Sequence, residues 1–165
     1  MKKTMNSFLS GILLLGMALV FTGCPYSAEF GIDANPTSKI NTQILGNHES
    51  KESSDYSYTI SKQDDYLYKF EKKSSSSSSI ESYNAYLSNI DGVQFLNVYE
   101  VGSSKNSYFF YKLTISSGGD TLTLASVTEN ITEQFKSSEE MKKFFLKYMY
   151  LSFFFEKEED VYVRK

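Results

Sequence analysis

The chain has 165 residues, a formal net charge of −3 and a single cysteine. This length suits one domain with short flanking segments. A mildly acidic chain lacks the positive field that phosphate recognition needs, so we expect no nucleic-acid partner. One thiol excludes an internal disulfide. The 13 Tyr and 13 Phe residues, with no Trp, favour half-buried β-strands.

The first 24 residues have the layout of an export signal. Lys2 and Lys3 precede an uncharged, largely apolar run over residues 8–21. This run is shorter than the roughly 17–25 residues of a membrane-spanning helix and is typical of a secretory signal. It ends in the sequence VFTGC, whose last residue is Cys24.

These residues resemble the lipobox of bacterial lipoproteins, in which small residues precede an obligatory cysteine. Thr22 and Gly23 match that pattern, and Phe21 stands where the family usually has Leu. The resemblance covers residues 1–24. It implies removal of residues 1–23 and lipid attachment to Cys24 through a diacylglyceryl thioether, with fatty acyl chains such as palmitate. Pro25 rather than Asp follows the cysteine, which by family resemblance favours the outer membrane and leaves its periplasmic and surface leaflets open.

Residues 24–38 are interpreted as a lipidated, flexible tether. They mix turn-forming residues with scattered apolar ones and show no periodicity. The expected folded domain therefore occupies residues 39–165.

Alternating aromatic and polar residues predict a series of strands joined by short turns. Asp91-Gly92 is a strong signal for a tight hairpin turn. Six consecutive serines at 74–79 are interpreted as a slack connection rather than as an adaptable binding loop. The predicted strands cover residues 55–62, 66–73, 82–90, 93–101, 107–115, 120–127 and 161–164.

One amphipathic helix is predicted over residues 138–149. Ser137 and Glu140 have the spacing of a capping box. Apolar residues then recur at helical spacing and form a stripe that we expect to cover the end or flank of the sheet. They are Met141, Phe144, Phe145, Tyr148 and Met149.

The predicted fold is mainly β: a small antiparallel meander barrel, or a curled sheet, of seven to eight strands with one C-terminal amphipathic helix. Closure would remove exposed strand edges, and the last strand is expected to pair near residues 44–50. This order of elements resembles the lipocalin-like barrels of small bacterial lipoproteins. Their first strand typically carries Gly-x-Trp, and Gly46-Asn47-His48 stands at that place. No binding residue is transferred from the resemblance.

The sequence contains few groups suited to catalysis. His48 is the only histidine and is interpreted as a strand residue rather than a catalytic base. The acidic run at residues 156–160 is interrupted by Lys157 and does not match an EF-hand loop, so a solvated loop is favoured over a Ca²⁺ site. We expect no catalytic residue, no metal and no cofactor.

The tyrosines on the predicted strands have two interpretations. They could line a pocket for an apolar or aromatic ligand, or they could fill a small barrel solidly, which is the interpretation we favour. The tyrosines concerned are Tyr58, Tyr68, Tyr86, Tyr99, Tyr111 and Tyr162.

Three functions stay open at this point. The first is a membrane-anchored, non-enzymatic envelope lipoprotein that binds or scaffolds another envelope protein. The alternative is a lipocalin-like carrier of a small hydrophobic ligand. A hydrolase acting through carboxylates has least support, because no pattern in the sequence brings two carboxylates together.

Overall fold

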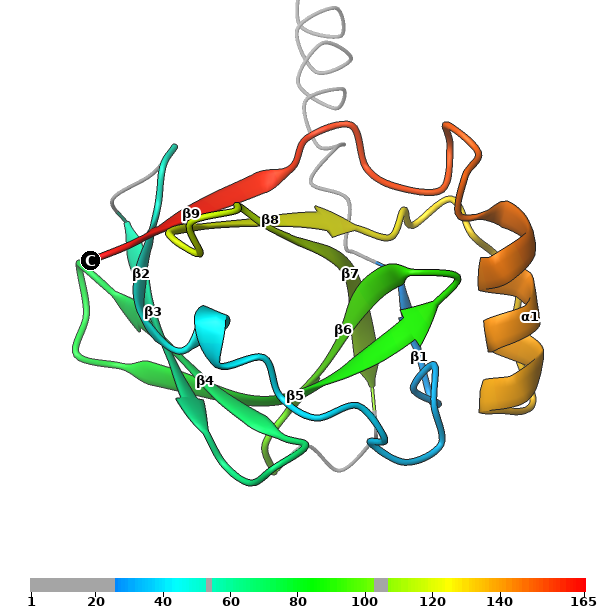
Figure 1. Ribbon diagram of the computed structural model, residues 1–165, viewed down its shortest axis with the longest axis horizontal. Coiled ribbons are helices and arrows are strands. Elements are labelled where there is room, and N and C mark those ends of the chain that lie inside the picture. Colours follow the sequence, from blue (N-terminus) through cyan, green and yellow to red (C-terminus); the bar gives the residue numbers. More distant parts are fainter. Residues whose placement is uncertain (1–25, 53–54, 103–106) are drawn as a thin grey trace, which may run out of the picture.

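A computed structural model describes residues 26–52, 55–102 and 107–165, so the predicted signal and Cys24 lie outside the described residues. The described chain forms nine strands, one 3₁₀ turn and one α-helix (Figure 1). In chain order these are β1 (Ser27–Ala28), η1 (Thr42–Ile44), β2 (Gly46–Ser50), β3 (Tyr56–Lys62), β4 (Tyr68–Ser74), β5 (Ile80–Ile90), β6 (Val93–Glu100), β7 (Tyr108–Ile115), β8 (Thr121–Ser126), α1 (Ser138–Tyr148) and β9 (Asp160–Arg164).

Strands β2 to β9 form a closed antiparallel barrel. Each strand from β2 to β8 pairs with the next, and β9 pairs with both β8 and β2. The last strand thus closes the ring, with Arg164 opposite His48, and Figure 1 looks into that ring. The predicted fold class is confirmed, including the pairing of the last strand with the first strand of the barrel. The short β1 is an additional strand on the edge of β7.

The turn between β5 and β6 has the conformation that its sequence predicts. Asp91 and Gly92 both adopt positive φ, at 51° and 82°, as a two-residue hairpin turn with the right-handed strand twist requires. Ile90 and Val93 are register partners across it. The turn therefore sets the register of the longest strand, and with it which side chains of β5 and β6 face inward.

Apolar side chains form two layers, one inside the barrel and one outside it. The inner layer includes Ile60, Leu96 and Leu113. The outer layer covers β5 to β8, where Phe95 and Phe110 pack against Phe145 of α1 with ring centroids 5.4 and 5.5 Å apart. The helix therefore lies outside the ring (Figure 1), and its predicted apolar stripe covers the flank of the barrel.

The helix begins where its sequence predicts. The Ser137 hydroxyl accepts a hydrogen bond from the Glu140 N–H at 3.2 Å. The Glu140 carboxylate reaches back to the Lys136 N–H at 2.8 Å. The first bond satisfies a backbone donor that the first turn of a helix leaves without a partner, and the second ties the residue before the cap to the same turn.

The described part of the predicted tether is packed on the barrel, so the expectation of a free segment over residues 24–38 is wrong for residues 26–33. Tyr26 and Ile32 are buried in the outer layer. Asp33 forms an ion pair with Lys142 of α1, with 2.6 Å between Oδ1 and Nζ. Gly31 is needed here because a Cβ at this position would lie 1.7 Å from the Tyr86 hydroxyl oxygen. Isolated contacts of this kind leave no periodicity in the sequence.

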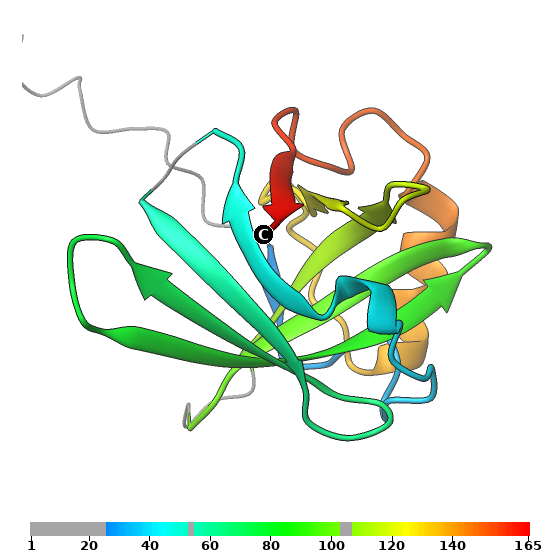
Figure 2. The ribbon, with the colours of Figure 1, turned by 60° about the vertical axis from the view of Figure 1, so that its left-hand side comes forward.

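The two ends of the barrel differ. At one end, which we call the closed end, residues 38–45 run across the end of the barrel from one side to the other (Figure 2). They contact the β3–β4 turn, where Ile40 N donates to Asp65 O at 3.0 Å, and the β7–β8 turn, where Gln43 lies against Gly119. The opposite end, which we call the open end, contains the starts of β3, β5, β7 and β9. The serine-rich connection between β4 and β5 also lies there.

Asn97 is predicted to hold the N-terminal segment in place. Its buried amide oxygen accepts from Ile32 N–H at 2.8 Å, and its amide nitrogen donates to Tyr86 O at 3.2 Å and to Ser88 Oγ at 3.0 Å. Asn97→Ala should lower the free energy of unfolding by about 1–3 kcal/mol, because buried polar groups lose their partners. It should also expose residues 26–33 to proteolysis. Urea unfolding and limited proteolysis measure the two effects.

The matched control is Asn84→Ala, on the outward-facing side of the neighbouring strand, where the asparagine is half-buried. Equal loss of stability in both variants would show that Asn97 has no special role in docking the segment.

Candidate ligand-binding cavity

The barrel encloses a cavity of about 420 Å³ that opens at one end. The expectation of a solidly filled interior is therefore wrong. Eight strands can enclose either a filled core or a space for one small ligand, and the second case applies. The cavity is lined by Ile44, His48, Tyr58, Ile60, Phe70, Lys72, Tyr83, Leu96, Val98, Phe109, Tyr111, Leu113, Leu122, Leu124, Asp160 and Tyr162.

Space remains inside the barrel because some of the chain's many Tyr and Phe side chains face outward. Tyr86 lies in the outer layer and donates its hydroxyl to the Asp33 carbonyl at 2.7 Å. Tyr99 packs against Tyr108 with ring centroids 5.2 Å apart, and these two are register partners on neighbouring strands. The α-helix and the N-terminal segment cover much of this outer face, so aromatic side chains are buried there rather than inside the barrel.

The six tyrosines singled out from the sequence are thus divided among three places. Tyr58, Tyr111 and Tyr162 line the cavity. Tyr68 belongs to the inner layer, but its hydroxyl is used at the closed end, where it accepts from Asn41 N–H. The remaining two, described above, lie on the outer face.

Several lining residues were not singled out from the sequence. Tyr83 alternates with Ala85 and Leu87 on the inner side of β5, and Lys72 follows Phe70 at the same spacing on β4. The sequence favours a solvated acidic loop for Asp160; the residue is indeed exposed, but it is the first residue of β9 and lies at the cavity. Asp160 lies two residues before Tyr162. A predicted last strand that began at residue 160 instead of 161 would have placed both side chains on the inner side of the barrel.

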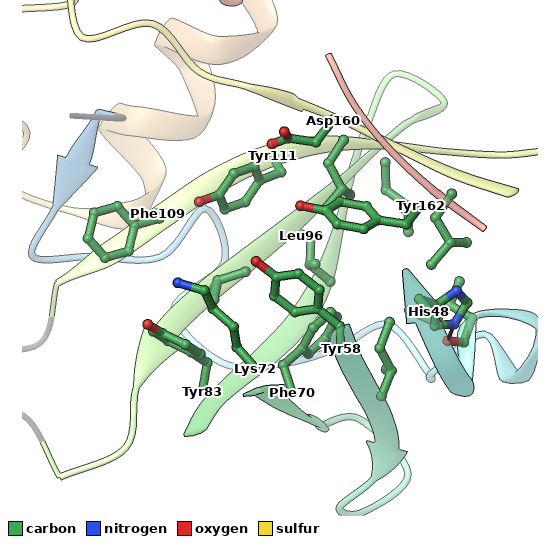
Figure 3. Close-up of a pocket in the computed structure, with 16 residues that line it drawn as sticks. His48, Tyr58, Phe70, Lys72, Tyr83, Leu96, Phe109, Tyr111, Asp160 and Tyr162 are labelled. Carbon is green, nitrogen blue, oxygen red and sulfur yellow. Dashed lines mark hydrogen bonds between the residues drawn. The ribbon is translucent and has the colours of Figure 1, made fainter. Parts of the chain in front are cut away.

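Polarity changes along the depth of the cavity. Its deeper wall is formed by aliphatic side chains such as Ile60, Leu113 and Leu122. The hydroxyl groups of Tyr58 and Tyr162 and the amine of Lys72 project into the space nearer the open end (Figure 3). A molecule with an apolar body and a polar end matches this arrangement, because apolar walls supply burial and a few polar groups fix orientation.

Three tyrosines and one carboxyl group form a cluster on one side of the cavity. The rings of Tyr58 and Tyr162 meet edge to face, with centroids 5.1 Å apart. Burial raises the pKa of both, and it raises the pKa of Tyr111 to about 12. All three hydroxyls therefore stay protonated at neutral pH and keep their capacity to donate.

Asp160 lies beside Tyr111 in this cluster (Figure 3). The surrounding wall desolvates its carboxyl group and raises its pKa, and the negative charge of Glu52 adds to the shift. Asp160 is nevertheless an exposed residue at the edge of the cavity, so its carboxyl group is only partly desolvated.

A charged pair lies on another side of the cavity, near its opening. Lys72 Nζ is 3.2 Å from Glu81 Oε2 and 4.3 Å from the ring centroid of Tyr56. The Tyr83 hydroxyl donates to the same Glu81 oxygen at 2.7 Å. These hydrogen bonds lower the pKa of Glu81. A half-exposed pair contributes little to stability, but the contacts hold the Lys72 amine at the wall of the cavity.

His48 lies on the inner side of β2, in the strand position that the sequence indicates. Its Nε2 is 2.9 Å from the carbonyl oxygen of Ile44. A carbonyl only accepts, so Nε2 carries the proton. The buried Nδ1 has no hydrogen-bond partner among the described residues. Burial lowers the pKa of His48, and the residue links β2 to the 3₁₀ turn.

The acidic run before β9 does not act as a unit. Glu156 Oε1 accepts from Glu129 N–H at 3.3 Å, and Glu159 Oε1 lies 3.6 Å from Lys112 Nζ. Across residues 26–52, 55–102 and 107–165, no three His, Cys, Asp or Glu side chains lie close enough together to hold a metal ion. None of the helices in these ranges is long and apolar enough to span a membrane.

Comparison with known proteins finds no family model, no curated protein sequence and no solved structure that matches this chain. The cavity must therefore be interpreted from its own chemistry.

His48 is predicted to make stability depend on pH. Its pKa in the folded protein lies below the unfolded value of 6.5. As pH falls through 6.5, the unfolded chain takes up the proton first, so the free energy of unfolding decreases; above that pH the contribution is constant. His48→Gln should remove this part of the slope.

Urea unfolding at a series of pH values on both sides of 6.5 gives the free energy of unfolding of wild type and variant. The difference between the two proteins reports His48 alone, because the carboxyl groups contribute equally to both. The same pH slope in both proteins would contradict a buried, neutral His48.

Proposed function

We propose that this protein is a membrane-anchored, non-enzymatic binding module that carries one small hydrophobic molecule with a polar end inside its barrel. The observation that carries this proposal is the cavity of about 420 Å³. Ligand sites occupy roughly 300–1,000 Å³ and combine apolar walls with a few polar groups. This cavity meets both conditions, which favours a carrier over a protein whose barrel only provides a scaffold.

The wall chemistry suggests how the ligand would lie. Its apolar part would contact Leu96, Leu113 and Leu122 in the deeper part of the cavity. Burial there contributes about 0.8 kcal/mol for each methylene group removed from water. Its polar end would lie between the tyrosine hydroxyls on one side and the amine of Lys72 on the other.

Two further features support the proposal. A closed eight-stranded antiparallel barrel is compatible with a lipocalin-like binding module, the class that the order of elements resembles. The lipobox-like residues ending at Cys24 support attachment to a bacterial envelope membrane, with the outer membrane favoured. Two or more acyl chains on one residue would make that attachment stable, whereas a single chain gives only marginal binding.

A specific surface favours a second candidate, a scaffold that binds another envelope protein. Four apolar side chains at the end of α1 and just beyond it are exposed, and contiguous exposed apolar groups often mark interaction sites. They are Leu146, Tyr150, Leu151 and Phe153. This second function is compatible with a ligand in the barrel.

Native mass spectrometry of the full-length protein, extracted from its membrane in mild detergent, tests the carrier function. We expect one small molecule bound per chain. Leu124→Trp should abolish its retention, because Leu124 lines the cavity and the larger side chain occupies the ligand's space. Thr123→Trp is the matched control, since the neighbouring residue on β8 points away from the cavity and is also only half-buried.

An apo protein in every preparation that also fails to bind any added amphiphile would contradict the carrier function. Retention by Leu124→Trp at the wild-type level would place the ligand elsewhere on the protein.

Cys24→Ser tests the anchor separately. Without the sulfur no thioether can form, so the protein should move from the membrane fraction to the soluble fraction. Cell fractionation with immunoblotting measures the distribution. A variant that stays in the membrane fraction after detergent-free washing would show that attachment does not depend on lipid at Cys24.

A further inference from the structure

The N-terminal segment is fixed to the barrel wall close to the cavity. Tyr26 N donates to Val127 O, just beyond the end of β8, at 3.2 Å. The next residue, Ser27, is the register partner of Phe109, which lines the cavity. Cys24 precedes Tyr26 by two residues, which span at most about 7 Å. A lipid anchor at Cys24 would therefore lie within a short distance of this part of the wall.

The open end also carries exposed apolar side chains at the ends of three strands. Tyr56 at the start of β3 is 41% exposed, Ile80 at the start of β5 is 57% exposed, and Val101 just after β6 is 51% exposed. The register confirms that they share this end, because Lys73 of β4 pairs with Ile80 and Val101 N donates to Ser82 O of β5. We call Tyr56, Ile80 and Val101 the apolar rim.

The closed end has a different surface. The β3–β4 turn carries Lys62, Asp64 and Asp65, with an exposed ion pair between Lys62 and Asp65. The β7–β8 turn contains only serine, glycine and aspartate between Ile115 and Thr121. The exposed apolar side chains of the open end form the apolar rim, and at the closed end the β3–β4 turn exposes one aromatic residue, Tyr66. The larger exposed apolar group lies at the end of α1, where the Tyr150 hydroxyl donates to Asp91 of the β5–β6 turn at 3.0 Å.

We propose that the open end of the barrel rests on the lipid bilayer, so that the cavity opens toward the membrane. This inference rests on the proposed anchor at Cys24. A short link to a docked strand prevents the barrel from turning freely, and the apolar rim then enters the interfacial layer of the membrane. A ligand with an apolar body passes between bilayer and cavity without crossing water.

The charges near the opening suggest that contact with the bilayer is apolar rather than ionic. Lys72 is paired with Glu81, and Asp160 and Glu52 add negative charge on the other side of the cavity. A surface of mixed sign gains little from anionic lipid. Uncharged phosphatidylcholine vesicles are therefore the appropriate probe.

The absence of tryptophan from the chain permits a direct test with single-tryptophan variants. Tyr56→Trp places the probe at the open end, and Tyr66→Trp places it in the β3–β4 turn at the closed end. The two residues flank the same strand, β3, and their exposures are matched at 41% and 39%. Each full-length, lipid-modified protein is reconstituted into phosphatidylcholine vesicles that contain lipid brominated near the headgroup.

We expect bromine to quench most of the emission of Tyr56→Trp and to leave that of Tyr66→Trp unchanged. Adding Ile80→Glu and Val101→Glu to Tyr56→Trp should reduce the quenching, whereas Leu146→Glu on the exposed face of α1 should not. Flotation of the same vesicles reports whether the anchor holds.

Equal quenching of the two probes, or stronger quenching of Tyr66→Trp, would overturn the proposed orientation. Protein that floats with the vesicles while neither probe is quenched would overturn the orientation and leave the anchor intact. Protein that does not float would overturn the anchor and the orientation together, and the carrier function would still be decided by mass spectrometry.

Discussion

Closure of the sheet by its last strand is the constraint on which the rest of the structure depends. The five residues of β9 pair with β2 on one side and with β8 on the other. An antiparallel meander without this strand would expose two edges able to pair with another chain. Closure also fixes the inner and outer side of every strand, because side chains alternate along each one. The cavity and the polar groups around its opening follow from that assignment.

The distribution of aromatic side chains explains why the closed barrel has space inside. Phe95 and Phe110 on the outer face pack against Phe145 of the helix, and Tyr86 is held by the N-terminal segment. The outer layer thus buries rings that would otherwise have to fill the interior. Aliphatic side chains and the sides of a few tyrosine rings remain to line the barrel, and they enclose a volume suited to one ligand.

Local patterns were sufficient to predict the strands from β3 onward, the helix and an antiparallel meander that either closes into a barrel or curls. Asp91-Gly92 and the Ser137–Glu140 pair specify a turn and a cap through bonds between neighbouring residues, so the sequence alone reveals them. Docking of residues 26–33 depends on contacts with Asn97 and Lys142, far away in the chain, and leaves no local pattern. The sequence favoured a filled barrel over a pocket for a similar reason, since the side of the strand that Tyr86 and Tyr99 face depends on what covers that side.

Binding of a series of single-chain amphiphiles with increasing chain length tests the central claim most directly, because it measures the apolar depth of the barrel. Isothermal titration of the detergent-extracted protein should give one site. Each added methylene should improve affinity about fourfold, as expected from roughly 0.8 kcal/mol per methylene buried, until the chain fills the cavity and the affinity levels off. Affinity that is independent of chain length, or no binding at any length, would contradict a hollow barrel built to hold an apolar molecule.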